Sequence, residues 1–133
     1  MKNLFFLFLS IIMISSCSKD KTDPIPDRNK FLASYSVIQN CPSGNSNYDI
    51  SITTSAENES TILISNFLGL GAIAKATVSG TNLSIPNQIV NIQGNSVTIN
   101  SGSGSLNGSL LTMAYGYSFN NQTENCSMNC TKK

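Results

Sequence analysis

The residues of this sequence that could carry covalent or metal chemistry are few, and four of them are cysteines. Cys17 ends an apolar N-terminal run, Cys41 follows a stretch of alternating residues, and Cys126 and Cys130 lie close together near the C-terminus. The chain has no histidine, so it can form neither a Ser-His-Asp nor a Cys-His catalytic arrangement. The chemistry open to the cysteines is covalent modification, disulfide formation or metal binding.

Residues 1–16 have the layout of a secretory signal peptide. The basic start MKN is followed by a mainly apolar run over residues 4–14 and by two small residues, Ser15 and Ser16. An apolar run of roughly 7–15 residues is typical of a signal peptide, whereas a helix that spans a bilayer needs about 20 apolar residues. We therefore expect residues 1–16 to be cleaved.

The segment ISSC, residues 14–17, resembles the lipobox of bacterial lipoproteins, in the two-serine form that is common in Bacteroidota. The resemblance implies that Cys17 becomes the first residue of the mature chain and carries the lipid. Ile14 departs from the leucine of the usual consensus. The resemblance also implies attachment to the outer membrane by up to three acyl chains, and two or more chains anchor a protein stably.

The stretch after this cysteine differs in composition from the rest of the chain. Residues 18–30 read SKDKTDPIPDRNK and hold seven charged side chains, whereas residues 31–131 hold only five. The two prolines of the first segment favour extended backbone. We expect a flexible charged tether over residues 17–30, with lipidated Cys17 at its start, and a single β-domain over residues 31–133.

The first residues of the tether bear on the side of the membrane that the protein occupies. Ser18-Lys19-Asp20 loosely resembles the export signal of surface lipoproteins in Bacteroidota, but Lys21 interrupts the acidic run. Surface exposure and the periplasmic leaflet of the outer membrane therefore both remain open.

Composition excludes some partners and favours strands. The formal net charge is +1 and only 11% of residues are charged, so no basic surface is expected that would bind nucleic acid. The 133 residues include 21 serines, 17 asparagines and 10 threonines. Such residues favour turns, and threonine also suits strands. One domain of short strands with polar turns is the simplest interpretation.

From Phe31 onward, apolar residues alternate with polar ones. Clear runs with this period of two are FLASYSVIQNC (31–41), YDISI (48–52), AKATV (74–78) and LTMAYGYSF (111–119). The alternation predicts antiparallel strands with one buried face, and turn residues separate the runs; Asn107-Gly108 predicts a two-residue hairpin. We expect an all-β fold: an antiparallel meander of about eight strands, closed or nearly closed into a barrel, with a two-sheet sandwich as the alternative.

Lipidation of Cys17 would leave three cysteines in an oxidising compartment, and therefore one disulfide and one free thiol. In a strand, Cys126 and Cys130 would lie about 13 Å apart, beyond the roughly 7 Å that a disulfide spans. Cys41 ends the first expected strand and Cys126 lies in the last, and these strands are neighbours in a closed barrel. We expect Cys41–Cys126; Cys41–Cys130 is the alternative, and Cys126–Cys130 would need an intervening turn.

Other chemistry has weaker support. A metal site at three thiols is disfavoured because an oxidising compartment removes free thiolates. Glu57 and Glu59 lie in a predicted turn, and nothing in the sequence brings Asp49 and Glu124 together as a catalytic pair. We expect no enzyme activity and no cofactor or metal.

The segment SGSGS, residues 101–105, has two interpretations. It faintly resembles the SGSG stretch of membrane-bound lysozyme inhibitors, which implies a loop in which Ser101 and Ser103 contact a lysozyme-like hydrolase. Leu106 and Asn107 do not supply the Lys-Tyr-like element that follows in those inhibitors. The alternative is a glycine-rich strand where a barrel curves sharply.

A wider resemblance covers most of the chain. It rests on Tyr35, NC (40–41), YDISI (48–52), ISNF (64–67), LSIPNQ (83–88), SGSG (101–104) and NC (125–126). These segments resemble a group of small Bacteroidota lipoproteins with one β-domain and no assigned activity; Cys130 departs from their pattern.

The expected function is therefore binding of an unknown protein or small molecule by a domain that a lipid holds at the membrane. An eight-stranded barrel can hold one small ligand if its interior is not filled. Tyr35 and Tyr115 are candidate contacts, as are Tyr48 and Tyr117, although core packing is the favoured role for these four rings.

Overall fold

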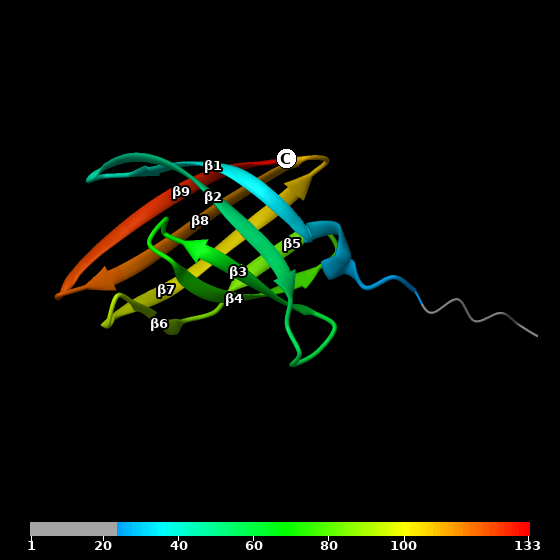
Figure 1. Cartoon of the computed structure of the whole chain (residues 1–133), viewed down its shortest axis with the longest axis horizontal. Coiled ribbons are helices and arrows are strands. Elements are labelled where there is room, and N and C mark those ends of the chain that lie inside the picture. Colours follow the sequence, from blue (N-terminus) through cyan, green and yellow to red (C-terminus); the bar gives the residue numbers. More distant parts are fainter. Residues whose placement is uncertain (1–23) are drawn as a thin grey trace, which may run out of the picture.

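The computed structural model describes residues 24–133, and most of them are in strands (Figure 1). The expected signal peptide, Cys17 and the first part of the tether lie outside the described residues. In chain order the elements are η1 (Asp27–Phe31), β1 (Ala33–Cys41), β2 (Gly44–Thr54), β3 (Thr61–Phe67), β4 (Ala72–Ser79), β5 (Asn82–Ile85), β6 (Gln88–Ile92), β7 (Asn95–Asn107), β8 (Leu110–Phe119) and β9 (Gln122–Lys132). Within residues 24–133, no helix is long and apolar enough to cross a membrane.

The strands form one antiparallel sheet that closes on itself. Their order is β5-β4-β3-β2-β1-β9-β8-β7-β6, and β5 also pairs with β7 from Asn82↔Ser105 to Ile85↔Gly102. Eight strands therefore form a closed barrel, and β6 is an extra strand that pairs with β7 alone. The predicted barrel of about eight strands is confirmed, and the sandwich alternative is wrong.

The alternating sequence pattern determines which side chains fill the barrel. Along β4, for example, Ala72, Ala74, Ala76 and Val78 are buried while the residues between them are exposed. The inward-facing residues of all the barrel strands form one hydrophobic cluster. The small residues of β4 and β7 leave room inside for the larger rings of Phe67 and Tyr115, whose centroids are 4.8 Å apart.

The first and last strands of the barrel are joined by a covalent bond. β1 pairs with β9 from Tyr35↔Lys132 to Asn40↔Ser127, and a disulfide links Cys41 to Cys126 with their Cα atoms 4.4 Å apart. Cys130 lies further along β9 as a buried free thiol. The pairing expected at the junction of the first and last strands is the one that the structure forms.

One end of the barrel is closed by η1. Phe31 is completely buried, and the Arg28 guanidinium donates hydrogen bonds to the carbonyl oxygens of Ser55 (3.0 Å) and Asn58 (2.6 Å). The Asp27 carboxylate accepts a bond of 2.8 Å from the amide of Gly80. The predicted domain boundary at residue 30 is therefore too late, because the charges of Asp27 and Arg28 bind backbone groups at this end of the barrel. Residues 27–30 belong to the folded domain.

Several turns differ in detail from the prediction. In the 107–110 hairpin the central residues are Gly108 and Ser109, one position later than expected, because Asn107 pairs with Leu110. Gly108 adopts a φ of +60°, which a turn of this kind requires at its first central position. The turn at Asn120 and Asn121, both with positive φ, was not predicted.

Strand β6 is a further element that the sequence analysis missed. Beside it, β4 lacks a backbone-paired neighbour along part of its edge. β4 pairs with β5 only from Thr77 to Ser79, so the rest of its edge lies beside β6. The Gln88 side chain bridges this gap: its carbonyl accepts a bond of 2.8 Å from the Lys75 amide, and its nitrogen donates one of 2.9 Å to the Lys75 carbonyl. The side chain thus replaces a missing backbone pair.

Candidate functional site

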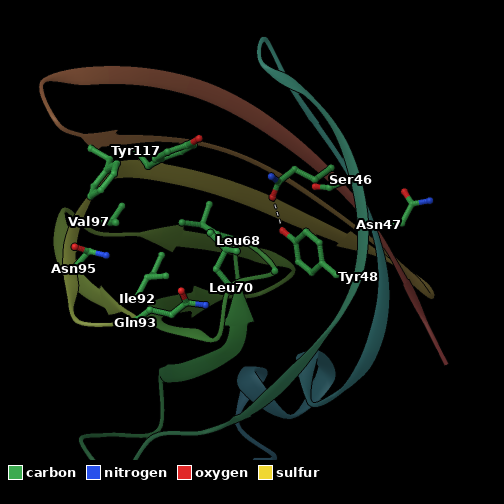
Figure 2. Close-up of a pocket in the computed structure, with 13 residues that line it drawn as sticks. Ser46, Asn47, Tyr48, Leu68, Leu70, Ile92, Gln93, Asn95, Val97 and Tyr117 are labelled. Atoms are coloured by element: carbon green, nitrogen blue, oxygen red, sulfur yellow. Dashed lines mark hydrogen bonds between the residues drawn. The ribbon is translucent and has the colours of Figure 1, made fainter.

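A cavity opens at the end of the barrel opposite η1. Four connections meet there: residues 42–43, 68–71, 93–94 and 120–121. The cavity has a volume of about 560 Å³, which lies within the range of small-molecule sites. Its lining residues come from β1, β2, β6, β7 and β8 and from the β3–β4 connection (Figure 2): Gln39, Ser46, Asn47, Tyr48, Leu68, Gly69, Leu70, Ile92, Gln93, Asn95, Val97, Tyr117 and Phe119.

The walls of the cavity differ in character. The β1–β2 side presents the uncharged hydrogen-bonding groups of Gln39, Ser46 and Tyr48, whereas Leu68 and Leu70 of the β3–β4 connection form an apolar wall with neighbouring Ile92 and Val97. Of the described residues that line the cavity, none carries a charge. The cavity is therefore suited to a small molecule with an apolar body and an uncharged polar group.

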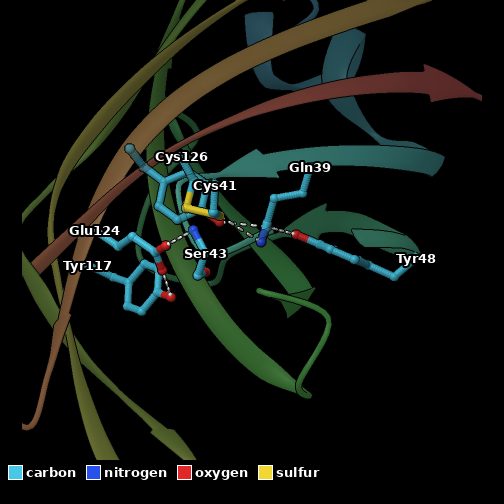
Figure 3. Close-up of a disulfide and its surroundings, with 8 residues drawn as sticks. Gln39, Cys41, Ser43, Tyr48, Tyr117, Glu124 and Cys126 are labelled. Atoms are coloured by element: carbon cyan, nitrogen blue, oxygen red, sulfur yellow. Dashed lines mark hydrogen bonds between the residues drawn. A yellow bond between two sulfur atoms is a disulfide. The ribbon is translucent and has the colours of Figure 1, made fainter. Parts of the chain in front are cut away.

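Gln39 is the centre of the polar side. Its side chain is only 7% exposed, and its carbonyl oxygen accepts hydrogen bonds from the phenols of Tyr48 and Tyr115, the latter at 2.6 Å. Its amide nitrogen donates to the Cys41 sulfur at 3.3 Å (Figure 3). Burial raises the pKa of both phenols above the ordinary value, so both remain protonated donors near neutral pH.

A carboxylate lies behind the Tyr117 side of the cavity. The Glu124 side chain accepts a bond of 2.6 Å from the Ser43 amide and one of 2.5 Å from the Tyr117 hydroxyl (Figure 3). The bond from Ser43, followed by that from Tyr117, lowers the pKa of Glu124, and the bond to Glu124 together with burial raises that of Tyr117 to about 12. At neutral pH the pair therefore consists of an ionised Glu124 and a protonated Tyr117.

The β3–β4 connection has an unusual backbone that shapes the apolar wall. Asn66 and Leu68 adopt φ values of +60° and +65°, which are uncommon for residues with side chains. The Asn66 side chain stabilises the loop: its nitrogen donates to the Asp49 carbonyl at 2.7 Å, and its oxygen accepts from the Gly71 amide at 2.9 Å. Such backbone strain persists where surrounding contacts enforce it, and it concentrates at functional sites.

Gly69 lets this loop approach the opposite wall. A Cβ atom added at Gly69 would lie 2.8 Å from Cδ1 of Tyr48, so only glycine permits this contact. The glycine also has a φ of +69°, which residues with side chains rarely adopt. Contact with the loop and the bond to Gln39 together determine the position of the Tyr48 ring.

Of the four candidate contact tyrosines, two line the cavity and two do not. Tyr35 is completely buried and donates its hydroxyl to the Phe31 carbonyl at 2.8 Å, and Tyr115 is buried beneath Gln39. Tyr48 and Tyr117 do line the cavity. Gln39 was missed altogether, although its alternation with Tyr35 and Val37 places a polar residue on a buried face.

The segment SGSGS does not form a loop. It lies inside β7, where it pairs with β5 on one side and β8 on the other, and Ser101 and Ser103 project outward. A Cβ at Gly102 would come within 2.8 Å of the Ala114 carbonyl, and one at Gly104 within 2.7 Å of the Thr112 carbonyl. The glycines permit close strand packing, and the protruding loop expected of an inhibitor is absent from the described residues.

The remaining acidic and sulfur groups have other partners. Cys41, Glu124 and Cys126 cluster within 4.8 Å of one another, but the two sulfur atoms are bonded to each other and cannot act as thiolate ligands. Asp49 forms an ion pair with Lys133, and Glu57 forms one with Lys75. Among the described residues, Asp49 and Glu124 thus have separate partners: Lys133 for Asp49, and Ser43 with Tyr117 for Glu124.

Comparison with protein-family models finds no match, and comparison with curated proteins finds no similar sequence. The fold and the cavity nevertheless define a structural class. The domain is a small closed antiparallel barrel with η1 at one end (Figure 1). The cavity lies at the other end.

Proposed function

We propose that this protein is a lipid-anchored lipoprotein of the outer membrane whose barrel binds a small, largely apolar molecule without transforming it. The observation that carries the proposal is the cavity of about 560 Å³, in which an apolar wall faces the buried Gln39 amide. A buried amide with satisfied hydrogen bonds gives a fixed polar contact, and the apolar wall supplies the binding energy.

The positions of η1 and the cavity at opposite ends of the barrel support ligand binding on the side that faces away from the membrane. The described N-terminal residues enter the barrel at η1 (Figure 1). The cavity opens at the opposite end. A lipid at Cys17 would therefore hold the closed end nearer the membrane and direct the cavity toward the periplasm or the cell exterior. The ligand would reach the cavity from the aqueous side.

Ligand binding is tested with N-phenyl-1-naphthylamine, an uncharged dye whose fluorescence rises in apolar surroundings. The chain from residue 17 with Cys17→Ser is the protein used. Leu70→Glu places a charge at the cavity wall, and Ile73→Glu is the matched control because the two side chains are 55% and 58% exposed and only Leu70 lines the cavity. We expect Leu70→Glu to weaken dye binding at least tenfold and Ile73→Glu to leave it unchanged. Equal effects would contradict the proposed site.

The anchor is tested separately in cells that express the full chain. An alkyne analogue of palmitate should label the protein, and Cys17→Ala should abolish both the label and membrane fractionation. Persistent labelling of the Cys17→Ala chain would contradict lipidation at this residue without bearing on the cavity.

A further inference from the structure

We infer that the cavity selects uncharged ligands with a hydrogen-bond donor, such as an alcohol group, over carboxylates and other anions. This inference rests on the proposed binding function and specifies the chemical class of its ligand. It follows from two features of the cavity: its phenol hydrogens are already used within the protein, and a fixed negative charge lies behind one wall.

The phenol hydrogens point into the protein. Tyr48 donates to the Gln39 carbonyl and Tyr117 donates to Glu124. Each phenol has a single hydrogen, so its oxygen then offers a ligand only lone pairs. A ligand hydroxyl or N–H can donate to these oxygens, whereas an ionised carboxylate only accepts hydrogen bonds and would face other acceptors.

The donors that remain are few. The Gln39 amide nitrogen directs one bond to the Cys41 sulfur at 3.3 Å, which leaves its second hydrogen as the buried donor of the polar side. Ser46, Asn47, Gln93 and Asn95 also line the cavity and can donate. All four are exposed, so water competes for their hydrogen bonds. One buried N–H can orient the oxygen of an alcohol, but it cannot replace the several hydrogen bonds that a carboxylate makes with water.

The negative charge on Glu124 also disfavours an anionic ligand. Its oxygen lies 2.5 Å from the Tyr117 hydroxyl, and Tyr117 lines the cavity, so one side chain separates the carboxylate from a bound ligand. None of the described lining residues offers a compensating positive charge. Repulsion between like charges is stronger in a partly dehydrated site than in bulk water, and an anionic ligand would experience it.

The test compares 1-decanol with decanoate as competitors of N-phenyl-1-naphthylamine near neutral pH. Decanol is used below its aqueous solubility limit and decanoate below its micellar concentration. Any apolar site favours the alcohol, so the informative quantity is the ratio of the two inhibition constants in matched variants. Glu124→Gln removes the charge and keeps one of the two acceptor oxygens; in the parent protein the Ser43 amide donates to Oε1 and the Tyr117 hydroxyl donates to Oε2. Glu57→Gln makes the same change at an exposed carboxylate that pairs with Lys75. Thermal unfolding establishes that each variant is folded.

We expect Glu124→Gln to reduce the preference for decanol by about fivefold or more, chiefly by tightening decanoate binding, and Glu57→Gln to leave the ratio unchanged. If the dye binds but Glu124→Gln leaves the ratio unchanged, or the parent protein prefers decanoate, the inference is wrong and the binding function stands. If calorimetry and dye fluorescence show that neither the dye nor either competitor binds, the binding function and the inference both fail.

Discussion

The Tyr115 hydroxyl donates a 2.6 Å hydrogen bond to the Gln39 carbonyl oxygen, although the two residues are 76 positions apart in the sequence. This bond joins β8 to β1 across the interior, and the Tyr48 hydroxyl meets the same oxygen from β2. The base of the cavity thus depends on one amide that serves two phenols. Removing the amide should therefore cost more than removing either phenol hydroxyl.

Gln39→Leu keeps most of the side-chain volume and deprives both phenols of their acceptor. Because a buried donor without a partner costs about 1–3 kcal/mol, we expect the free energy of unfolding to fall by roughly 2–3 kcal/mol in a denaturant titration. Adding Tyr115→Phe to Gln39→Leu removes the unpaired hydroxyl and should restore part of the loss. Purely additive losses in the double variant would show that the hydrogen bond is not the cause.

Two glycines of the β3–β4 connection provide a matched comparison. Both have positive φ, +69° at Gly69 and +81° at Gly71, but only an added Cβ at Gly69 meets the Tyr48 ring. Gly71→Ala should therefore cost about 1 kcal/mol of backbone strain. Gly69→Ala should cost more and also weaken dye binding, because it displaces Tyr48. Equal dye affinity in the two variants would indicate that Tyr48 does not depend on this contact.

Alkaline pH should destabilise the protein through groups that are buried in their protonated forms. Burial raises the pKa of the Cys130 thiol from 9.0 to about 12, and that of Tyr35 from 10.0 to about 12. Unfolding then releases protons above the unfolded pKa, so this contribution to stability is complete below about pH 9 and is lost progressively up to about pH 12.

The contribution of the Cys130 thiol to this pH dependence can be distinguished from that of the phenols, because the thiol has the lower pKa in the unfolded chain. We expect the free energy of unfolding to fall by up to ~1.4 kcal/mol per pH unit for each such group. Cys130→Ala should flatten the dependence between about pH 9 and about pH 10, where the thiol acts before the phenols. The comparison uses the slopes, because the variant also loses packing. An unchanged slope would indicate that Cys130 does not contribute.

Arg28 offers a test of the domain boundary. Its guanidinium binds the carbonyl oxygens of Ser55 and Asn58, so Arg28→Met should release η1 from the β2–β3 connection. Hydrogen exchange should then increase over residues 27–31 and 55–61, while the cavity end keeps its protection and its dye affinity. Lys30→Met is the control, since Lys30 pairs only with nearby Asp27 at the exposed surface. Similar exchange in both variants would indicate that the Arg28 hydrogen bonds do not hold η1 in place.

The barrel could be predicted from the sequence because its evidence is local and repeated. Alternation on β1, β2, β4 and β8 identifies strands and their buried faces, and short turns impose antiparallel neighbours. β6 was missed because QIVNI is short and follows a proline. The docking of η1 was missed because the charges of Asp27 and Arg28 are typical of a linker, and their backbone partners become apparent only after folding.

The cavity was less predictable because it depends on where along the barrel the inward-facing side chains leave space unfilled. Tyr35 and Tyr48 have the same chemistry and similar strand patterns, yet Phe31 covers one and the mouth of the barrel exposes the other. Alternation gives the face of a residue but not its depth along the barrel. Gln39 is a missed cavity residue that could have been predicted, since the sequence places a glutamine between Val37 and Cys41 on a buried face.

The disulfide closes a chain separation of 85 residues, and its removal should be the most damaging of these changes. On the chain-entropy model such a cross-link contributes about 4 kcal/mol, so Cys41→Ser with Cys126→Ser should lower the free energy of unfolding by roughly that amount. Because Gln39 donates to the Cys41 sulfur, dye affinity should also fall.

Peptide mapping without reduction provides the complementary measurement. The parent protein should yield only the Cys41–Cys126 pair, and Cys130, which is completely buried, should react with iodoacetamide only after unfolding. Cys130→Ala should leave the disulfide in place. A parent protein that reacts at Cys130 while folded, or that contains a Cys41–Cys130 pair, would contradict the arrangement of β1 against β9 at the cavity end.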